Sequence, residues 1–169
     1  MKKLYLVRHA KSSWEDSRLS DFDRPLNKRG KLNAPFMGTL LYERKVKPDL
    51  ILSSPAFRAK TTAEIISKKL NYTKEILFLQ EIYEGSVSSL EKILLSLNDE
   101  NNSVLLFGHN PSLNIFAQQY VDFEENIPTC GLLEIEFNCK SWSKINRENA
   151  RLIAFEYPKK YSSMGTSNE

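Results

Sequence analysis

An apolar run near the amino terminus ends directly in an arginine and a histidine, in the stretch Leu4-Tyr5-Leu6-Val7-Arg8-His9-Ala10. A short apolar run bounded by polar residues is typical of a buried β-strand. In open α/β sheets, ligands bind just beyond the carboxyl ends of the strands. The stretch therefore predicts a strand that presents Arg8 and His9 at the ligand-binding edge of a sheet.

Five further apolar runs predict the rest of the sheet. Ser103–Phe107 repeats the first pattern, because Gly108 and His109 follow it directly. The expected strands are Lys3–Val7, Asp49–Leu52, Glu75–Leu79, Ser103–Phe107, Leu132–Phe137 and Leu152–Tyr157. The last two alternate apolar and polar residues, which is typical of strands nearer the edge of a sheet.

Helical patterns lie between the strands. Leu32, Phe36 and Leu40 recur every four residues, the spacing of an apolar helix face, and predict a helix over about 27–44. Pro35 within it predicts a kink or a later helix start. Capping signals predict three further starts, at Ser54-Pro55, Ser88-Ser89-Leu90-Glu91 and Asn110-Pro111. The alternation of strands and helices predicts an α/β fold, a three-layer α/β/α sandwich with a mainly parallel central sheet.

The composition is that of one globular domain. Of 169 residues, 41% are hydrophobic and 27% are charged. A single domain over 1–157 is expected, followed by a polar tail over 158–169 that has no periodic pattern and is expected to be mobile. No apolar run approaches the roughly 20 residues that cross a bilayer, and no signal-peptide core is present. A cytoplasmic protein without a membrane partner is therefore expected.

Charge and cysteine content argue against other classes. The net charge is only +3 and aromatic residues do not alternate with basic ones, so no nucleic-acid partner is expected. Two cysteines and two histidines are too few for a disulfide framework or a zinc site, and neither a metal nor a cofactor is expected. The first 31 residues nevertheless carry nine lysines and arginines against four acidic residues, which favours an anionic ligand.

Three segments place reactive side chains at the same edge of the predicted sheet. Arg8 and His9 end one strand, His109 follows another, and Arg58 lies in the first turn of the helix after a third. A lone histidine after a strand is usually a hydrogen-bonded boundary residue, but here both histidines of the chain converge with two arginines. Arginine matches phosphate oxygens with paired hydrogen bonds, and a neutral imidazole attacks phosphorus. The set predicts a phosphoryl-transfer site with His9 as nucleophile, where a protonated His109 and the arginines neutralise charge without a metal.

These motifs resemble those of the histidine phosphatase superfamily, which has the phosphoglycerate-mutase-like fold. The stretch 6–10 is similar to the family's Arg-His-Gly signature, with Ala10 in place of the usual glycine. Residues 53–63 resemble its second phosphate-arginine segment, and Gly108-His109-Asn110 resembles its second-histidine motif. Lys11-Ser12-Ser13-Trp14, together with 23–30, is similar to the SixA-like phosphohistidine phosphatase branch. The match runs from residue 3 to about residue 157.

The resemblance implies a metal-independent phosphatase that forms a phosphohistidine intermediate on His9. It implies that Arg8, Arg58 and His109 bind the phosphoryl group.

The resemblance also points to an acid that protonates the leaving group. In many family members a glutamate performs this role in a segment similar to 79–85, which indicates Glu81 here. Asp21 and Asp23, in the loop after His9, are the other candidates.

The expected substrate follows from the compactness of the chain. Larger family members that act on sugar phosphates carry inserts, and none is evident between Tyr83 and Ser88 or after Ser112. An open pocket accepts a phosphate on a protein surface, so protein phosphohistidine is the leading substrate. The alternatives are a phosphatase for small phosphomonoesters and a phosphate-binding module without turnover. The intact nucleophile argues against the second of these. The oligomeric state is not indicated.

Overall fold

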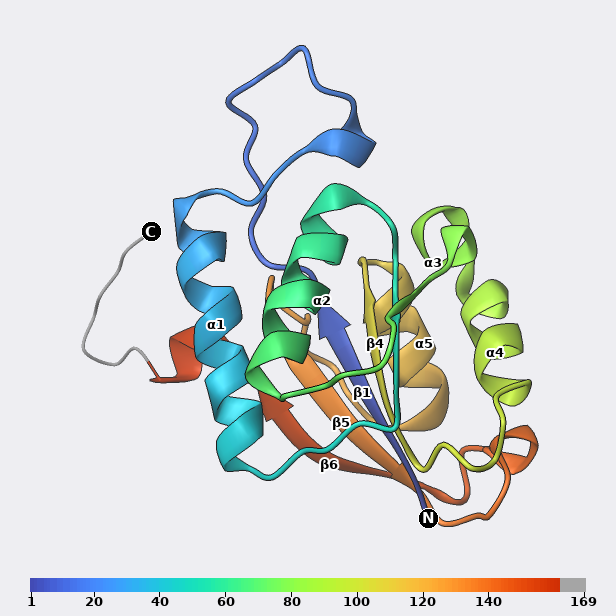
Figure 1. Cartoon of the computed structure of the whole chain (residues 1–169). Coiled ribbons are helices and arrows are strands. Elements are labelled where there is room, and N and C mark those ends of the chain that lie inside the picture. Colours follow the sequence, from blue (N-terminus) through green and yellow to red (C-terminus); the bar gives the residue numbers. More distant parts are fainter. Residues whose placement is uncertain (162–169) are drawn as a thin grey trace.

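The computed structural model describes residues 1–161, and its centre is a six-stranded sheet (Figure 1). The strand order is β3-β2-β4-β1-β5-β6. The first four strands in this order run parallel, whereas β5 is antiparallel to both β1 and β6. The strands are β1 Lys2–Arg8, β2 Leu50–Ser53, β3 Leu77–Phe78, β4 Ser103–Gly108, β5 Leu132–Phe137 and β6 Ala150–Glu156. This mostly parallel sheet confirms the predicted α/β class.

Helices cover both faces of the sheet and complete the three layers (Figure 1). One face carries α1 Lys28–Glu43 and α2 Phe57–Lys69, and the other carries α3 Gln80–Glu84, α4 Val87–Leu95 and α5 Ser112–Tyr120. Leu4 and Leu6 of β1 belong to the core beneath α4 and α5, while Tyr5 and Val7 belong to the core beneath α1 and α2. Because β1 is covered on both faces, its central residues 4–7 form an unbroken apolar run.

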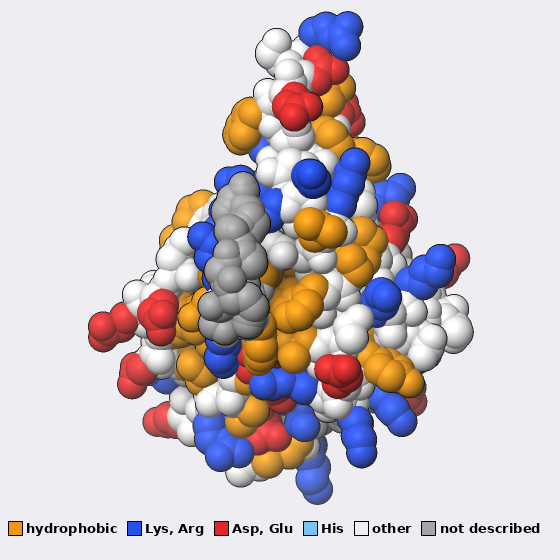
Figure 2. Space-filling model, turned by 90° about the vertical axis from the view of Figure 1, so that its left-hand side faces the viewer, with side chains coloured by type: hydrophobic (Ala, Val, Ile, Leu, Met, Phe, Trp, Pro, Cys, Tyr) orange, Lys and Arg blue, Asp and Glu red, His pale blue; other side chains and the backbone are white. Residues whose placement is uncertain are grey.

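Helix α1 buries a different face from the one that its apolar spacing indicated. Leu32 and Phe36 are 65% and 43% exposed (Figure 2 views this side of the molecule). The buried residues of the helix are Gly30, Ala34, Met37, Gly38 and Leu41. A Cβ added to Gly38 would lie 2.8 Å from the side chain of Lys69 in α2, so the close approach of the two helices favours small residues at the contact. The helix starts at Lys28 and continues through Pro35, so a later start at the proline is wrong.

The other predicted helix starts are wrong by one or two residues. α2 has Ala56 as its N-cap, because the hydroxyl of Ser54 accepts the Ala56 N–H (3.1 Å) ahead of the helix. α4 begins after Ser86 without a side-chain cap, and α5 begins after Pro111. The predicted strand over 75–79 shortens to the two exposed residues of β3, which pair with β2 at the edge of the sheet.

Residues 11–27, which we call the arm, project beyond the sheet between β1 and α1 (Figures 1 and 2). A bridge between Ser12 and Leu26 closes the base of the arm, and the arm contains the 3-10 turn η1 Asp21–Asp23. Asn27 ends the arm and caps α1 by accepting the Gly30 N–H at 2.8 Å. The chain therefore leaves the edge of the sheet after His9, runs out through the arm and returns to that edge before α1 begins.

The described part of the chain closes with the 3-10 turn η2 Trp142–Lys144, strand β6 and a last 3-10 turn, η3 Pro158–Tyr161. The turn η3 is held by a hydrogen bond from the Tyr161 hydroxyl to Glu156 and by ring contact with Phe36. The predicted tail thus begins with a defined turn, and its remainder, 162–169, lies outside the described residues. Within residues 1–161, no helix is long and apolar enough to cross a membrane.

Candidate active site

The two histidines lie side by side at the carboxyl ends of the central strands. Arg8 of β1 pairs in register with Gly108 of β4, so the residue after each strand is a histidine. The ring centroids of His9 and His109 are 5.1 Å apart. Arg58, in the first turn of α2, donates from Nε to His9 Nε2 at 3.4 Å. The structure therefore brings together all four residues that the strand ends and the helix start indicated.

These side chains line a pocket of about 460 Å³ between the edge of the sheet, the arm and α3. Among the described residues its lining includes four cationic side chains and one carboxylate. The cations are Arg8, Lys11, Arg24 and Arg58, and the carboxylate is Asp21. A cleft with this excess of positive charge attracts an anion such as a phosphoryl dianion.

The two ring nitrogens of His9 have different roles: Nδ1 is bound to the backbone, and Nε2 is unprotonated. Its side chain is buried, and Nδ1 lies 2.8 Å from the carbonyl oxygen of Ala10, which can only accept a hydrogen bond. Nδ1 therefore carries the proton, and Nε2 keeps its lone pair. Burial, together with the nearby His109 and Arg58, lowers the pKa of His9 to about 3. The ring is consequently neutral near pH 7, as a nucleophile must be.

His109 is also neutral in this structure. Burial and the charge of Arg58 lower its pKa to about 4, so the protonated His109 expected beside a phosphoryl group is not the form favoured in the pocket without an anion. Its Nε2 lies 2.8 Å from the hydroxyl of Ser54. Its Nδ1 and the Nε of Arg8 are buried and have no hydrogen-bond partner among residues 1–161. An oxyanion that reaches the pocket would raise the pKa of the ring again, because negative charge favours imidazolium.

The predicted acid Glu81 lies outside the pocket. Glu81 is exposed on α3, because the same helical turn directs Ile82 into the core at 4% exposure. Asp23 also lies outside, where it accepts a hydrogen bond from Ser20 at 3.0 Å. Asp21 lies in the pocket, but hydrogen bonds from Tyr83 and Arg58 lower its pKa to about 2. Near pH 7 Asp21 is therefore a carboxylate without a proton to donate.

Sequence reasoning missed several side chains of the pocket. The Tyr83 ring packs edge-on against His109, with centroids 5.5 Å apart, and its hydroxyl donates to Asp21 at 2.7 Å. Arg24 is buried at the base of the arm and stacks on Trp14, with Cζ 3.3 Å from the ring centroid. The motif segments around 11–14, 23–30 and 79–85 contain these residues, but no periodicity placed them at the site.

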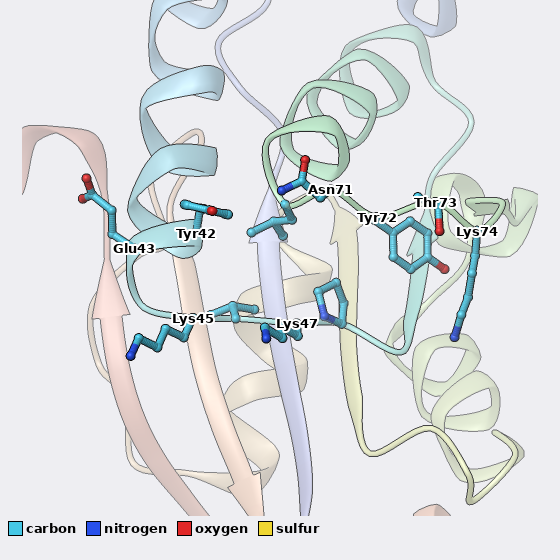
Figure 3. Close-up of a pocket in the computed structure, with 11 residues that line it drawn as sticks. Tyr42, Glu43, Lys45, Lys47, Asn71, Tyr72, Thr73 and Lys74 are labelled. Carbon is cyan, nitrogen blue, oxygen red and sulfur yellow. The ribbon is translucent and has the colours of Figure 1, made fainter.

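A second hollow lies at the far end of α1 and α2, away from the histidines (Figure 3). It is lined by the chain that follows each helix, including Lys45, Lys47, Tyr72 and Lys74. Its lining among the described residues contains no histidine or arginine. It therefore lacks the two residue types on which the phosphoryl-transfer site of the first pocket is built.

A mostly parallel α/β sheet with paired histidines and arginines at its edge defines a phosphoryl-transfer protein of the histidine type. The sequence model of the histidine phosphatase superfamily (branch 1) matches residues 4–94, and the chain belongs to this family. It is thus a phosphatase by class, and within the superfamily it is similar to the SixA phosphohistidine phosphatases.

Individual relatives agree with this placement. A structure from Agrobacterium tumefaciens assigned as the phosphohistidine phosphatase SixA is 29% identical, with a TM-score of 0.79 over 93% of this chain and 98% of that one. The structure of the protein histidine phosphatase SixA with tungstate is 22% identical and shares the fold, with a TM-score of 0.80 over 94% and 98% of the two chains. An uncharacterised chloroplast protein of Arabidopsis thaliana is 28% identical over 85% of this chain and 70% of its own length.

Proposed function

We propose that the protein removes the phosphoryl group from a phosphohistidine side chain of another protein, through a phosphohistidine intermediate on His9. In the first step a bond forms between His9 Nε2 and phosphorus while the bond from phosphorus to the leaving nitrogen breaks. In the second step water attacks the phosphorus, inorganic phosphate leaves, and His9 is restored. The neutral ring, whose Nε2 is unprotonated, supports His9 as the nucleophile.

The cationic side chains of the pocket supply the charge that such a transfer requires. Arg8 and Arg58 both line the pocket with His9, and the Nε of Arg58 faces the nucleophilic nitrogen. Fixed donors that face the transferring group stabilise the charge on its oxygens and need no rearrangement during the reaction. We therefore assign phosphate binding to Arg8, Arg58 and His109.

The substrate proposed here rests on the protonation state of the carboxyl group in the pocket. Asp21 is the one acidic side chain among the described lining residues, and its pKa is about 2. A pocket whose one described carboxyl group is unprotonated favours leaving groups that depart without a proton from such a group. A phosphohistidine ring that carries a proton on its other nitrogen releases neutral imidazole, whose conjugate acid has a reference pKa near 6.5, so this group departs far more readily than an alkoxide. The substrate class proposed here is therefore phosphohistidine on a protein.

A comparison of leaving groups tests this proposal. We expect kcat/KM to be high for a phosphohistidine protein, lower for p-nitrophenyl phosphate and lowest for an alkyl phosphomonoester. His9→Gln is the matched control, and rapid acid-free quenching of the wild type should trap phosphorus on His9. An alkyl ester hydrolysed as fast as phosphohistidine would make the protein a general phosphomonoesterase. Binding of substrate without any phosphorylated His9 would make it a phosphate-binding module.

A further inference from the structure

The guanidinium of Arg58 is held from the side opposite the nucleophile. Its Nη1 donates to the backbone carbonyl of Asp21 at 2.7 Å, and its Nη2 donates to Asp21 Oδ2 at 3.0 Å. Its Nε–H donates toward His9 Nε2. The Arg58 side chain is 9% exposed, so these contacts leave it little freedom. Both terminal nitrogens are thus bound by one residue of the arm, while Nε faces the atom that attacks phosphorus.

Asp21 is itself fixed by two neighbours. The Tyr83 hydroxyl donates to Oδ2 at 2.7 Å, and Arg24 Nη1 donates to Oδ1 at 2.9 Å. Arg24 in turn donates from Nε to the carbonyl of Ser13 at 3.1 Å and from Nη2 to the hydroxyl of Ser12. The carboxylate therefore joins the base of the arm, α2 and α3 in one hydrogen-bonded network.

We propose that Asp21 is a positioning residue, which holds Arg58 so that its Nε edge faces the phosphoryl group as it transfers to His9. This inference rests on the proposed function, because it presumes that His9 receives the group. Paired donors bind an oxyanion well only when the guanidinium plane is oriented correctly. Asp21 is then part of the catalytic apparatus, and its role extends beyond lining the pocket.

Two other roles for Asp21 make different predictions. A general acid would matter most for the most basic leaving group. A carboxylate that merely competes with phosphate for Arg58 would weaken anion binding, so its removal would tighten it. A positioning residue affects all substrates by the same factor, and its removal weakens anion binding.

The test uses Asp21→Ala, Asp21→Asn and Arg58→Ala, with Asp16→Ala as the matched control. Asp16 is an aspartate of the same arm that pairs with an arginine, Arg18, at 3.0 Å. We expect Asp21→Ala to lower kcat/KM by about 10-fold to 100-fold, the range for coupled neighbours, equally on phosphohistidine and p-nitrophenyl phosphate. Asp21→Asn, which keeps an oxygen acceptor, should lose less, and Asp16→Ala should resemble the wild type.

The decisive measurement is a double-mutant cycle. If Asp21 acts through Arg58, Asp21→Ala should cost almost nothing more in an Arg58→Ala protein. Full additivity, a loss that depends on the leaving group, or tighter binding of inorganic phosphate by calorimetry would each overturn the proposal. Thermal melts of every variant check folding. Phosphate binding also distinguishes a failure of the positioning role of Asp21 from a failure of the proposed function. It reports on the alignment of Arg58 even if no phosphorylated His9 is found.

Discussion

Lowering the pH from 8 to 5 is expected to leave both histidine rings of this protein uncharged. An ordinary histidine, with a pKa near 6.5, is about 97% protonated at pH 5. His9 has a pKa of about 3 because it is buried beside other cationic groups, and at pH 5 about 1% of it would be protonated. The pKa of His109 is lowered to about 4 for the same reasons.

The lowered pKa of His9 also makes folding stability depend on pH. Below pH 6.5 the unfolded chain binds a proton at this residue, whereas the folded chain does not until about pH 3. Stability is therefore lost as the pH falls through 6.5, and the loss from His9 alone reaches about 2 kcal/mol at pH 5. His109 contributes in the same direction.

Nuclear magnetic resonance measures the two rings directly, because the chain contains two histidines. The Cε1–H resonances are followed from pH 8 to pH 4.5 in a buffer without phosphate, and His109→Gln assigns them. Urea unfolding of the wild type and of His9→Gln at pH 7.5 and pH 5 measures how much stability His9 loses between the two pH values. The stability lost through carboxylates is common to both proteins and cancels in the comparison. We expect the wild type to lose about 2 kcal/mol more than the variant.

Two results would refute this reasoning. A histidine resonance that shifts with a midpoint near pH 6.5 would show that burial does not hold that ring neutral. An equal loss of stability in the wild type and in His9→Gln would show that His9 has the same pKa in the folded and unfolded chains.

The remaining predictions concern the site and its support. His9→Gln should lower turnover by about 10⁴-fold or more with little change in melting temperature at pH 7.5, and a loss within tenfold would exclude His9 as the nucleophile. EDTA should leave the rate unchanged, because side-chain cations neutralise the phosphoryl group; a rate restored by Mg²⁺ after chelation would contradict this. Glu81→Gln should change kcat/KM by less than about twofold on an alkyl phosphomonoester, whereas a loss of about 10²-fold would restore Glu81 as the acid. Gly30→Ala should lower the free energy of unfolding by about 1–3 kcal/mol in urea titrations, because its Cβ would lie 2.2 Å from the carbonyl of Lys11; an unchanged midpoint would mean that the arm shifts freely.

The sheet could be predicted from sequence because burial on both faces leaves a visible pattern. Residues 4–7 of β1 and residues 104–107 of β4 are apolar without interruption, and β5 has its predicted bounds, Leu132–Phe137. The buried face of α1 could not be predicted in this way. A four-residue spacing shows where apolar side chains gather. The side of α1 that packs is instead the one that approaches α2 closely at Gly38.

The core of the site could be predicted because parallel strands bring their carboxyl ends to one edge. That rule is sufficient to bring Arg8, His9 and His109 together. It could not place Tyr83 or Arg24, since their positions depend on how the arm and α3 cross the edge. Glu81 lies outside the pocket for a local reason. Along α3, Glu81 faces solvent, Ile82 faces the core and Tyr83 faces the pocket.

The hydrogen bond from His9 Nδ1 to the next carbonyl has a consequence for the product of the proposed first step. A phosphorylated imidazole exists as two isomers that differ in which ring nitrogen carries phosphorus. With Nδ1 bound to the backbone at 2.8 Å, the geometry permits the Nε2 isomer. The acceptor is a main-chain oxygen, so this regiochemistry does not depend on the side chain at position 10. Alanine at that position preserves it as well as glycine would.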